Sequence, residues 1–167
     1  MTRSRRAARS AASIGYDAQH VMLVGSAGGH LAQLLALRPW WEARRRTWVT
    51  FDTVDASSRL AGEDIVFAYH PTTRNGINLA RNFVLAFRQL ITRRPDLIVS
   101  TGAGVAVPFV VLARILGLPS MYIEVVDRVN TRTLTGRICY RLVDKFLVQW
   151  TEQLQLYPNA SVIGVLI

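Results

Sequence analysis

Apolar runs and segments with helical spacing alternate along the chain from His20 onward. The apolar runs are short and nearly continuous, as is typical of strands buried on both faces, and they lie at residues 21–24, 47–51, 65–68, 97–99, 121–123, 146–148 and 162–167. Segments with helical spacing separate them, at residues 31–37, 77–92, 104–116 and 136–143. Pro95, Gly117 and Pro119 follow the ends of two of these predicted helices.

This alternation predicts an α/β fold, a Rossmann-like doubly wound parallel sheet covered by helices on both faces. In the commonest order of such a sheet, the first and fourth strands are neighbours. The glycine-rich turns that follow these two strands, at residues 25–30 and 101–104, would then meet over one crevice. We expect one domain at residues 20–167, preceded by a basic, flexible tail at residues 1–19.

The charge of the chain points to a polyanionic partner. The 167 residues carry a net charge of +9, almost all of it from arginine, because Lys145 is the only lysine. Arginine pairs bidentately with phosphate, so the partner could be a nucleic acid, an anionic lipid surface or a diphosphate. Nucleic acid is disfavoured, because the sequence has no zinc-ligand spacing, recognition-helix signature or aromatic stacking motif. The single cysteine, Cys139, fits a reducing compartment, and neither a metal site nor a cofactor is predicted.

A membrane contact is predicted for the long helix at residues 77–92. Arginines recur every seven residues beside apolar side chains, and the predicted contact consists of Arg74, Arg81, Phe83, Phe87 and Arg88. A basic stripe beside an apolar face suits a helix that lies on anionic lipid, although a core-packed helix with a solvated face has the same composition. The arginines of the tail offer a second lipid contact, and no run of about 20 apolar residues predicts a membrane-spanning helix.

The first glycine turn predicts a phosphate or diphosphate site. Glycine lets backbone amides approach a ligand closely, and the helix N-terminus behind the turn adds a positive dipole end. The residues predicted to bind the diphosphate here are Gly25, Ser26, Gly28 and Gly29. A tight turn without a ligand is the alternative. A dinucleotide fingerprint fits poorly, because it requires glycine where this chain has Ala27 and His30.

His30 closes the first turn, where the positive helix end should lower its pKa. A neutral imidazole beside a hydroxyl group can take its proton, which makes His30 a candidate general base. A histidine that only caps or packs the turn is the alternative.

The second glycine turn extends the predicted diphosphate site with Thr101, Gly102, Ala103 and Gly104. Glu124 ends the fifth predicted strand, and carboxylates at the carboxyl ends of strands face the binding crevice of this architecture. Glu124 is therefore a second candidate catalytic residue, with Asp127 close behind it. Arg128 is expected to contact the diphosphate; alternatively it and Arg132 form structural ion pairs with these acids.

Five segments together resemble one known family. They are GSAGGH at 25–30, STGAGVAVP at 100–108, YIEVVDRV at 122–129, LTG at 134–136 and DKFLVQW at 144–150. As a set they are similar to the membrane-recruiting subunit of the split UDP-N-acetylglucosamine transferase of eukaryotic lipid-linked oligosaccharide synthesis, the asparagine-linked-glycosylation protein fourteen family. They look closer still to its bacterial relatives in capsular and exopolysaccharide assembly. The resemblance covers roughly residues 20–167.

The resemblance implies the N-terminal half of a GT-B glycosyltransferase, similar to MurG, acting peripherally at the cytoplasmic face of the membrane. It implies binding of a polyprenyl-diphosphate-linked sugar acceptor, with both glycine turns facing the diphosphate. It also implies a catalytic partner subunit that carries the C-terminal GT-B half and binds the UDP-sugar, so the chain alone is expected to have little activity. His30 matches the histidine that closes the glycine motif, and Glu124 matches the glutamate of the strand-end motif.

The eukaryotic pattern includes an N-terminal membrane anchor that this sequence lacks, so attachment is expected from the tail, the arginine-striped helix or the partner. Two other functions remain open: a scaffold that recruits the partner without a catalytic group, and a free-standing nucleotide-binding enzyme.

Overall fold

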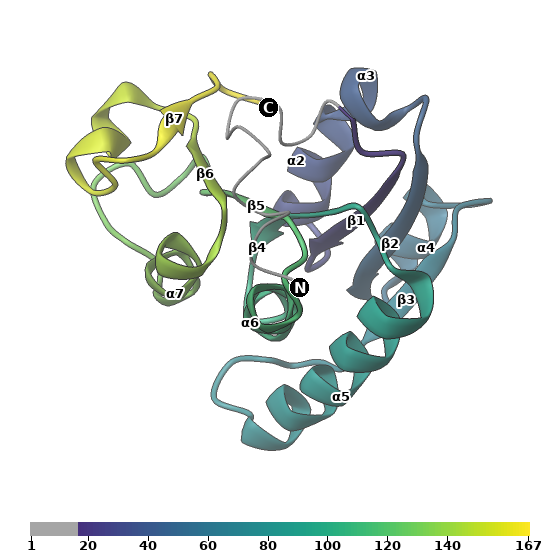
Figure 1. Cartoon of the computed structure of the whole chain (residues 1–167). Coiled ribbons are helices and arrows are strands. Elements are labelled where there is room, and N and C mark those ends of the chain that lie inside the picture. Colours follow the sequence, from purple (N-terminus) through teal and green to yellow (C-terminus); the bar gives the residue numbers. More distant parts are fainter. Residues whose placement is uncertain (1–16) are drawn as a thin grey trace.

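The fold is built on a seven-stranded parallel sheet with helices on both faces (Figure 1). The computed structural model describes residues 17–167. The strands are β1 (His20–Gly25), β2 (Arg45–Phe51), β3 (Ile65–Ala68), β4 (Leu97–Gly102), β5 (Ser120–Ile123), β6 (Lys145–Val148) and β7 (Ser161–Val162). Their order is β3-β2-β1-β4-β5-β6-β7, and all neighbours are parallel. The predicted Rossmann-like class and the adjacency of β1 and β4 are therefore confirmed.

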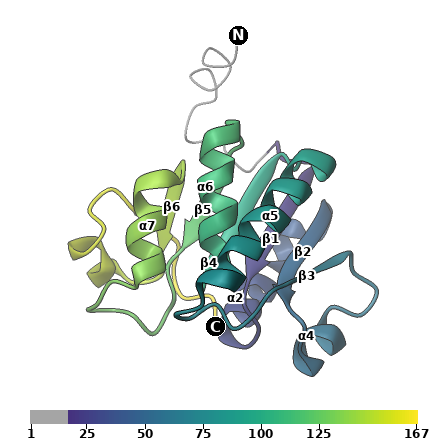
Figure 2. The ribbon, with the colours of Figure 1, turned by 90° about the horizontal axis from the view of Figure 1, so that it is seen from below.

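The helices form two layers, one on each face of the sheet. They are α2 (Gly29–Ala36), α3 (Arg38–Trp41), α4 (Val54–Arg59), α5 (Gly76–Arg93), α6 (Ala106–Leu116), α7 (Leu134–Leu142) and the 3-10 helix η1 (Thr151–Gln155). Figure 2 shows α5, α6 and α7 side by side over one face of the sheet, and α2 and α3 lie on the other face in Figure 1.

Alternate residues of the central strand β1 feed the two halves of the core. Val21 and Leu23 pack into the cluster beneath α2, α3 and α4, whereas Met22 and Val24 pack into the cluster beneath α5 and α6. All four side chains are fully buried. A continuous apolar strand is therefore required here, because a central parallel strand has no solvent-facing side.

Three short helical elements were not predicted from the sequence: α3, α4 and η1. The last predicted strand, at residues 162–167, is also wrong in length, because β7 pairs with β6 only at Ser161 and Val162. Beyond β7, Leu166 packs against the core beneath α2, whereas Ile163, Val165 and Ile167 are exposed.

Helix α5 buries two asparagines and exposes five apolar side chains. Its buried positions are Asn78, Asn82, Ala86 and Leu90. The exposed apolar side chains are Ile77, Leu79, Val84, Phe87 and Ile91. The two asparagines hold the loop before the helix: Asn82 donates to Tyr69 O and accepts from Tyr69 N, and Asn78 donates to Pro71 O. The apolar stripe therefore faces away from the core.

The residues of the predicted membrane contact lie on or beside α5. Arg81, Phe87 and Arg88 are exposed, and Phe83 is half-buried. Arg74 precedes the helix, in the loop, with a φ of 52°. Across residues 17–167 no helix combines the length and apolarity that crossing a bilayer requires. Of the tail predicted for residues 1–19, residues 1–16 lie outside the described part of the chain. Ala18, within it, is buried in the core.

Candidate functional site

The two glycine turns meet at the carboxyl ends of β1 and β4. Gly25 of β1 is paired with Gly102 of β4, after an irregularity in the register that follows Val24. The turn after β1 leads into α2, and the turn after β4 leads into α6. The predicted crevice therefore lies where the strand order reverses, which is where open α/β sheets bind their ligands.

His30, in the first turn of α2, is fixed to the opposite turn by two hydrogen bonds. Its Nδ1 lies 2.8 Å from the carbonyl oxygen of Thr101, and the Thr101 hydroxyl donates to the carbonyl oxygen of His30 over 2.8 Å. A carbonyl oxygen can only accept, so Nδ1 carries the proton and Nε2 of the neutral ring is left as an acceptor. The arrangement therefore aligns the imidazole for accepting a proton at Nε2.

Gly102 makes room for this imidazole. Its φ is +119°, and a Cβ placed there would lie 2.8 Å from the Tyr122 hydroxyl and 3.0 Å from Cε1 of His30. Only glycine tolerates both this backbone conformation and this approach. The second glycine turn thus shapes the site by admitting the histidine ring.

The pKa of His30 is lowered, chiefly because burial disfavours the charged ring. The Thr101 carbonyl and the negative charge of Asp127 act in the opposite direction and raise this pKa. The direction agrees with the sequence-based expectation, although burial, rather than the helix dipole, is the main cause. His30 is therefore neutral at pH 7, the form that a general base requires.

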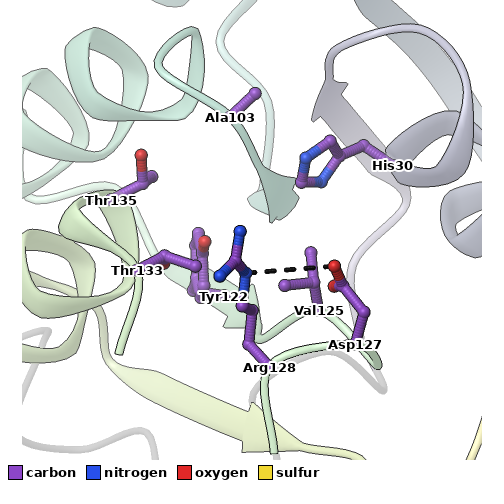
Figure 3. Close-up of a pocket in the computed structure, with 8 residues that line it drawn as sticks. All are labelled: His30, Ala103, Tyr122, Val125, Asp127, Arg128, Thr133 and Thr135. Atoms are coloured by element: carbon purple, nitrogen blue, oxygen red, sulfur yellow. Dashed lines mark ion pairs between the residues drawn. The ribbon is translucent and has the colours of Figure 1, made fainter. Parts of the chain in front are cut away.

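A cavity of about 160 Å³ opens beside the His30 ring (Figure 3). It is lined by His30, Ala103, Tyr122, Val125, Asp127, Arg128, Thr133 and Thr135. Asp127 and Arg128, on the loop between β5 and α7, form an exposed ion pair with 3.9 Å between Oδ2 and Nε. The cavity is smaller than the roughly 300–1,000 Å³ that usually encloses a drug-sized ligand. It suits one sugar or phosphate group rather than a whole nucleotide-sugar.

Of the predicted site residues, His30, Ala103 and Arg128 line this cavity. The other predicted glycines differ in their surroundings. A Cβ on Gly25 would lie 3.0 Å from Leu34 Cδ1, and one on Gly104 would lie 2.9 Å from Thr72, so both serve close packing. Gly28, with a φ of +70°, and Gly29 have nothing within 4 Å of an added Cβ. Of these four glycines, Gly28 and Gly29 in the middle of the first turn are therefore the ones with open space beside them.

Ser26 and Thr101 belong to the turns but are turned inward. Ser26 is 9% exposed, and its hydroxyl contacts the carbonyl oxygen of Ala27 at 3.4 Å. Thr101 is fully buried, and its hydroxyl donates a hydrogen bond to the His30 carbonyl oxygen. In this conformation their side chains support the turns and do not face the cavity.

Glu124 lies beneath the site and not on its surface. It has no exposed area; its carboxylate accepts hydrogen bonds from Tyr157 Oη, Thr133 Oγ1 and the Val125 amide. Burial raises its pKa, an effect that these three donors oppose. It forms no ion pair within residues 17–167. Of the alternative ion pairs considered for these acids, the one between Arg128 and Asp127 is present, whereas Arg132 stacks on the Tyr157 ring.

The sequence-based prediction missed four residues of the cavity wall: Tyr122, Val125, Thr133 and Thr135. All lie in or next to the motifs at 122–129 and 134–136. A signal for Thr133 was present, because a threonine immediately before a helical segment is a typical N-cap, and its hydroxyl accepts from the Gly136 amide at 2.8 Å. The loop before α7 therefore supplies more of the wall, with Val125, Asp127, Arg128 and Thr133, than the two glycine turns do.

A parallel sheet of this order, with two glycine turns meeting at its switch point, defines a Rossmann-like domain. Among solved structures, MurG of Acinetobacter baumannii superposes with a TM-score of 0.70 at 20% sequence identity. The match covers 87% of this chain and 45% of MurG. At this identity the likeness concerns the fold alone.

The sequence family is narrower. Residues 72–166 match the family described as "Oligosaccharide biosynthesis protein Alg14 like", and the chain belongs to that family. The human UDP-N-acetylglucosamine transferase subunit ALG14 is 34% identical over 86 residues, which is 48% of this chain and 40% of the human protein. The subunit of the same name from Candida albicans is 27% identical over 174 residues, covering 90% of this chain and 79% of that protein. This chain thus spans less than half the length of the human relative. Both relatives are eukaryotic, and neither supports the expected bacterial capsular branch.

Proposed function

We propose that this chain is the acceptor-binding subunit of a two-component glycosyltransferase. The enzyme moves a sugar from a UDP-sugar, with UDP-N-acetylglucosamine the first candidate, to a polyprenyl-diphosphate-linked sugar. The names of the family relatives support the reaction class. The observation that carries the proposal is the hydrogen bond between His30 Nδ1 and Thr101 O, which leaves Nε2 as the acceptor nitrogen of a ring that lines a cavity.

In the proposed reaction, the acceptor hydroxyl oxygen attacks the anomeric carbon of the donor sugar. The bond from that carbon to the diphosphate oxygen breaks, and its electron pair leaves with UDP. The proton of the hydroxyl passes to Nε2 of His30 as the new glycosidic bond forms, which inverts the anomeric configuration. A positioned base of this kind contributes roughly 10²–10⁴-fold to rate.

The acceptor diphosphate is proposed to lie along the open backbone of Gly28 and Gly29, with Arg128 as its cation. The first turns of α2, α6 and α7 contain no acidic residue that would repel it. The cavity has room for one sugar or phosphate group. The UDP-sugar is therefore assigned to a catalytic partner subunit with the C-terminal GT-B half.

The membrane contact is proposed to be the face formed by α5, α6 and α7. These three helices contain no acidic residue. Their exposed arginines are Arg81, Arg88, Arg114, Arg137 and Arg141. The apolar stripe of α5 runs beside Arg81 and Arg88, the combination that binds an anionic bilayer surface. We place the protein peripherally at the cytoplasmic face, where a lipid-linked acceptor is within reach.

The saccharide that the enzyme extends depends on which acceptor the two subunits bind together. An oligosaccharide is the first choice, because the matching family is described as an oligosaccharide biosynthesis protein. Capsule or exopolysaccharide assembly uses the same diphosphate-linked acceptor class and differs only in the saccharide.

The test is sugar transfer from UDP-N-acetylglucosamine, UDP-glucose or UDP-galactose to a polyprenyl-diphosphate-linked sugar in membranes. This chain, the candidate partner and both together are compared. Transfer only by the pair, abolished by His30→Ala without loss of the complex, is the expected result. Full activity of His30→Ala in an intact complex would instead indicate a scaffold, and tight nucleotide binding by this chain alone would indicate a free-standing enzyme.

A further inference from the structure

Side chains that follow β6 hold the cavity loop from behind. The loop from Val125 to Arg128 supplies three of the wall residues. Gln149 Nε2 donates to the Glu124 carbonyl over 2.9 Å, and Trp150 Nε1 donates to the Val126 carbonyl over 2.8 Å. Gln153 Nε2 donates to the carbonyls of Val125 and Arg128, over 3.1 and 3.3 Å. Four of the five carbonyls from 124 to 128 are thus bonded to three side chains, Gln149, Trp150 and Gln153, which we call the carbonyl clamp.

The carbonyl clamp is itself anchored in the core. Gln149 is 2% exposed and Gln153 is fully buried. The Gln153 oxygen accepts from the amides of Gln149 and Trp150, at 2.9 and 3.0 Å. Gln149 also donates to Gln33 of α2, the helix that begins beside His30, with 2.6 Å between the side-chain atoms. One buried amide therefore connects the cavity loop to the helix that carries the proposed base.

Glu124 holds the other side of the same wall. Its carboxylate accepts from Thr133 Oγ1 at 3.3 Å and from the Val125 amide at 3.1 Å, and it is also bonded to Tyr157 Oη. Thr133 lines the cavity and caps α7. A Cβ on Gly136 would lie 2.1 Å from Glu124 Oε2, so the helix can approach the carboxylate only at a glycine.

We propose that Glu124 and the carbonyl clamp of Gln149, Trp150 and Gln153 are positioning residues. They hold Asp127, Arg128 and Thr133 in place around the acceptor, and none of them exchanges a proton with it. The inference rests on the proposed function for its kinetic part. It assigns Glu124 a role different from that of a base, because the carboxylate faces the core and its oxygens are occupied.

The chemistry of the clamp argues against simple core filling. Burying an amide is costly unless all of its polar atoms are bonded, and apolar side chains fill the same volume without that requirement. The buried amides of Gln149 and Gln153 here donate to three carbonyls of one loop, those of residues 124, 125 and 128. Such a network fixes the position of a loop that has no secondary structure of its own.

The experiment uses variants that remove single bonds without disturbing the fold. Trp150→Phe removes the indole N–H together with one ring of the indole, from a side chain that is 37% exposed. Trp40→Phe, on the opposite layer, is its matched control. Glu124→Gln keeps the shape and one acceptor oxygen, whereas Glu124→Ala removes the group. Each is assayed with the partner for acceptor KM, kcat and pH profile, and alone for amide hydrogen exchange of residues 124–136.

We expect Trp150→Phe to raise the acceptor KM about 10-fold, the loss of roughly one hydrogen bond, with an unchanged acid limb of the pH profile. The exchange of residues 124–136 should become faster in this variant and in Glu124→Ala. Trp40→Phe should change neither quantity, and Glu124→Gln should recover most of the activity that Glu124→Ala loses.

Two results would overturn the proposal. One is a lower melting temperature in the clamp variants with unaltered KM and exchange, which would make these residues merely structural. The other is a loss of kcat and of the acid limb in folded Glu124→Gln, which would make Glu124 the base. Absence of transfer by the wild-type pair would refute the proposed function instead, and hydrogen exchange in the isolated chain would still decide whether the clamp positions the loop.

Discussion

At the scale of single residues, the site depends on one imidazole whose two nitrogens have different tasks. Nδ1 of His30 is committed to the Thr101 carbonyl, and burial keeps the ring neutral. Asp127 opposes that effect through its negative charge without forming a salt bridge to the ring. The Thr101 carbonyl thus fixes the ring and its tautomer, whereas burial and Asp127 act in opposite directions on its charge.

Replacing His30 with asparagine should lower kcat by about 10²–10⁴-fold, because the proton acceptor is lost while a polar group still reaches Thr101 O.

In the wild type a base must be unprotonated, and the lowered pKa moves the acid limb of kcat/KM below the usual histidine value of about 6.5. Asp127→Asn should move that limb to still lower pH, since it removes a charge that raises the pKa. Transfer kinetics from pH 5 to 8 check both expectations, and an acid limb that stays in place in Asp127→Asn would contradict the second.

The same lowered pKa links stability to pH. An unfolded chain binds the His30 proton below about pH 6.5, whereas the folded chain resists it, so this contribution is present at pH 7 and is lost as the pH falls toward the folded value. Denaturant unfolding should therefore show a smaller loss of stability between pH 7 and 5 in His30→Asn than in the wild type. Equal losses would mean that His30 does not contribute.

Gly102→Ala should destabilise the fold by about 1–3 kcal/mol, the usual cost of a strained backbone conformation, and displace the His30 ring. Gly76→Ala is the control, because an added Cβ there meets nothing within 4 Å. Alanine at position 76 should be neutral or stabilising by less than about 1 kcal/mol. Thermal unfolding of both variants distinguishes a demand for glycine from a general effect of substitution.

Glu124 marks the limit of residue-level prediction. Its position at the end of a strand was visible in the sequence, but the direction of its side chain depends on Tyr157, which is 33 residues away. Local pattern carries no information about such a partner. His30 and Arg128 were predictable because the turn and the loop that hold them are adjacent to the crevice in any sheet of this order.

At the scale of elements, α5 is unusual because two asparagines share its buried face with Ala86 and Leu90, while five other apolar side chains are exposed. The buried asparagines are bonded to the backbone of the loop that precedes the helix. The exposed apolar side chains of α5 form a stripe that faces away from the core of the described residues. The apolar period of this helix therefore does not mark its buried face. Helical spacing predicted the length of α5 well, but spacing alone does not say which side faces the core.

Asn82→Ala should cost about 2 kcal/mol of unfolding free energy, because it leaves both the amide and the carbonyl of Tyr69 without partners. Thr92→Ala, at an exposed site of the same helix, is the control and should cost much less. Urea unfolding measures the difference. Equal losses in the two variants would show that the Asn82 bonds contribute little.

The elements that were not predicted share a physical reason. Helix α3 has four residues, and α4 contains valine, aspartate and two serines, which are weak helix formers. The α4 helix begins because Thr53 caps it and buries Ala56 at the core, a tertiary contact that a propensity pattern does not contain. The longer strands were predictable because burial on both faces makes them continuously apolar. The longer helices were predictable because apolar residues recur along them at helical spacing.

At the scale of the whole molecule, charge divides between the two helical layers. On the side of the sheet covered by α2, α3 and α4, three arginines are paired with acids: Arg38 with Glu42, Arg46 with Glu63 and Arg59 with Asp55. The arginines at 81, 88, 114, 137 and 141, on the opposite layer, form no salt bridge with an acidic residue in the described part of the chain. One face therefore carries a field that an anionic surface can neutralise.

Vesicle binding tests this asymmetry. Arg81→Gln with Arg88→Gln should weaken binding to phosphatidylserine-containing vesicles roughly 30-fold, at about 1 kcal/mol for each arginine. Arg38→Gln with Arg59→Gln removes the same charge from the other layer and should leave binding almost unchanged. Flotation at two ionic strengths measures both, and equal effects of the two pairs would refute a defined membrane face.

The strand order also governs how the protein is made. The central strand β1 acquires one neighbour early, where Val21 pairs with Arg46, but its other neighbour only when Leu97 has been synthesised. Until then the nascent polypeptide carries an apolar strand with an open edge, and such edges promote aggregation. Pairings between distant residues are also slow to form. During synthesis, β1 is thus exposed to solvent although its apolar side chains are fully buried in the folded protein. The first half of the chain therefore needs a chaperone or another cover over this strand until β4 has been synthesised.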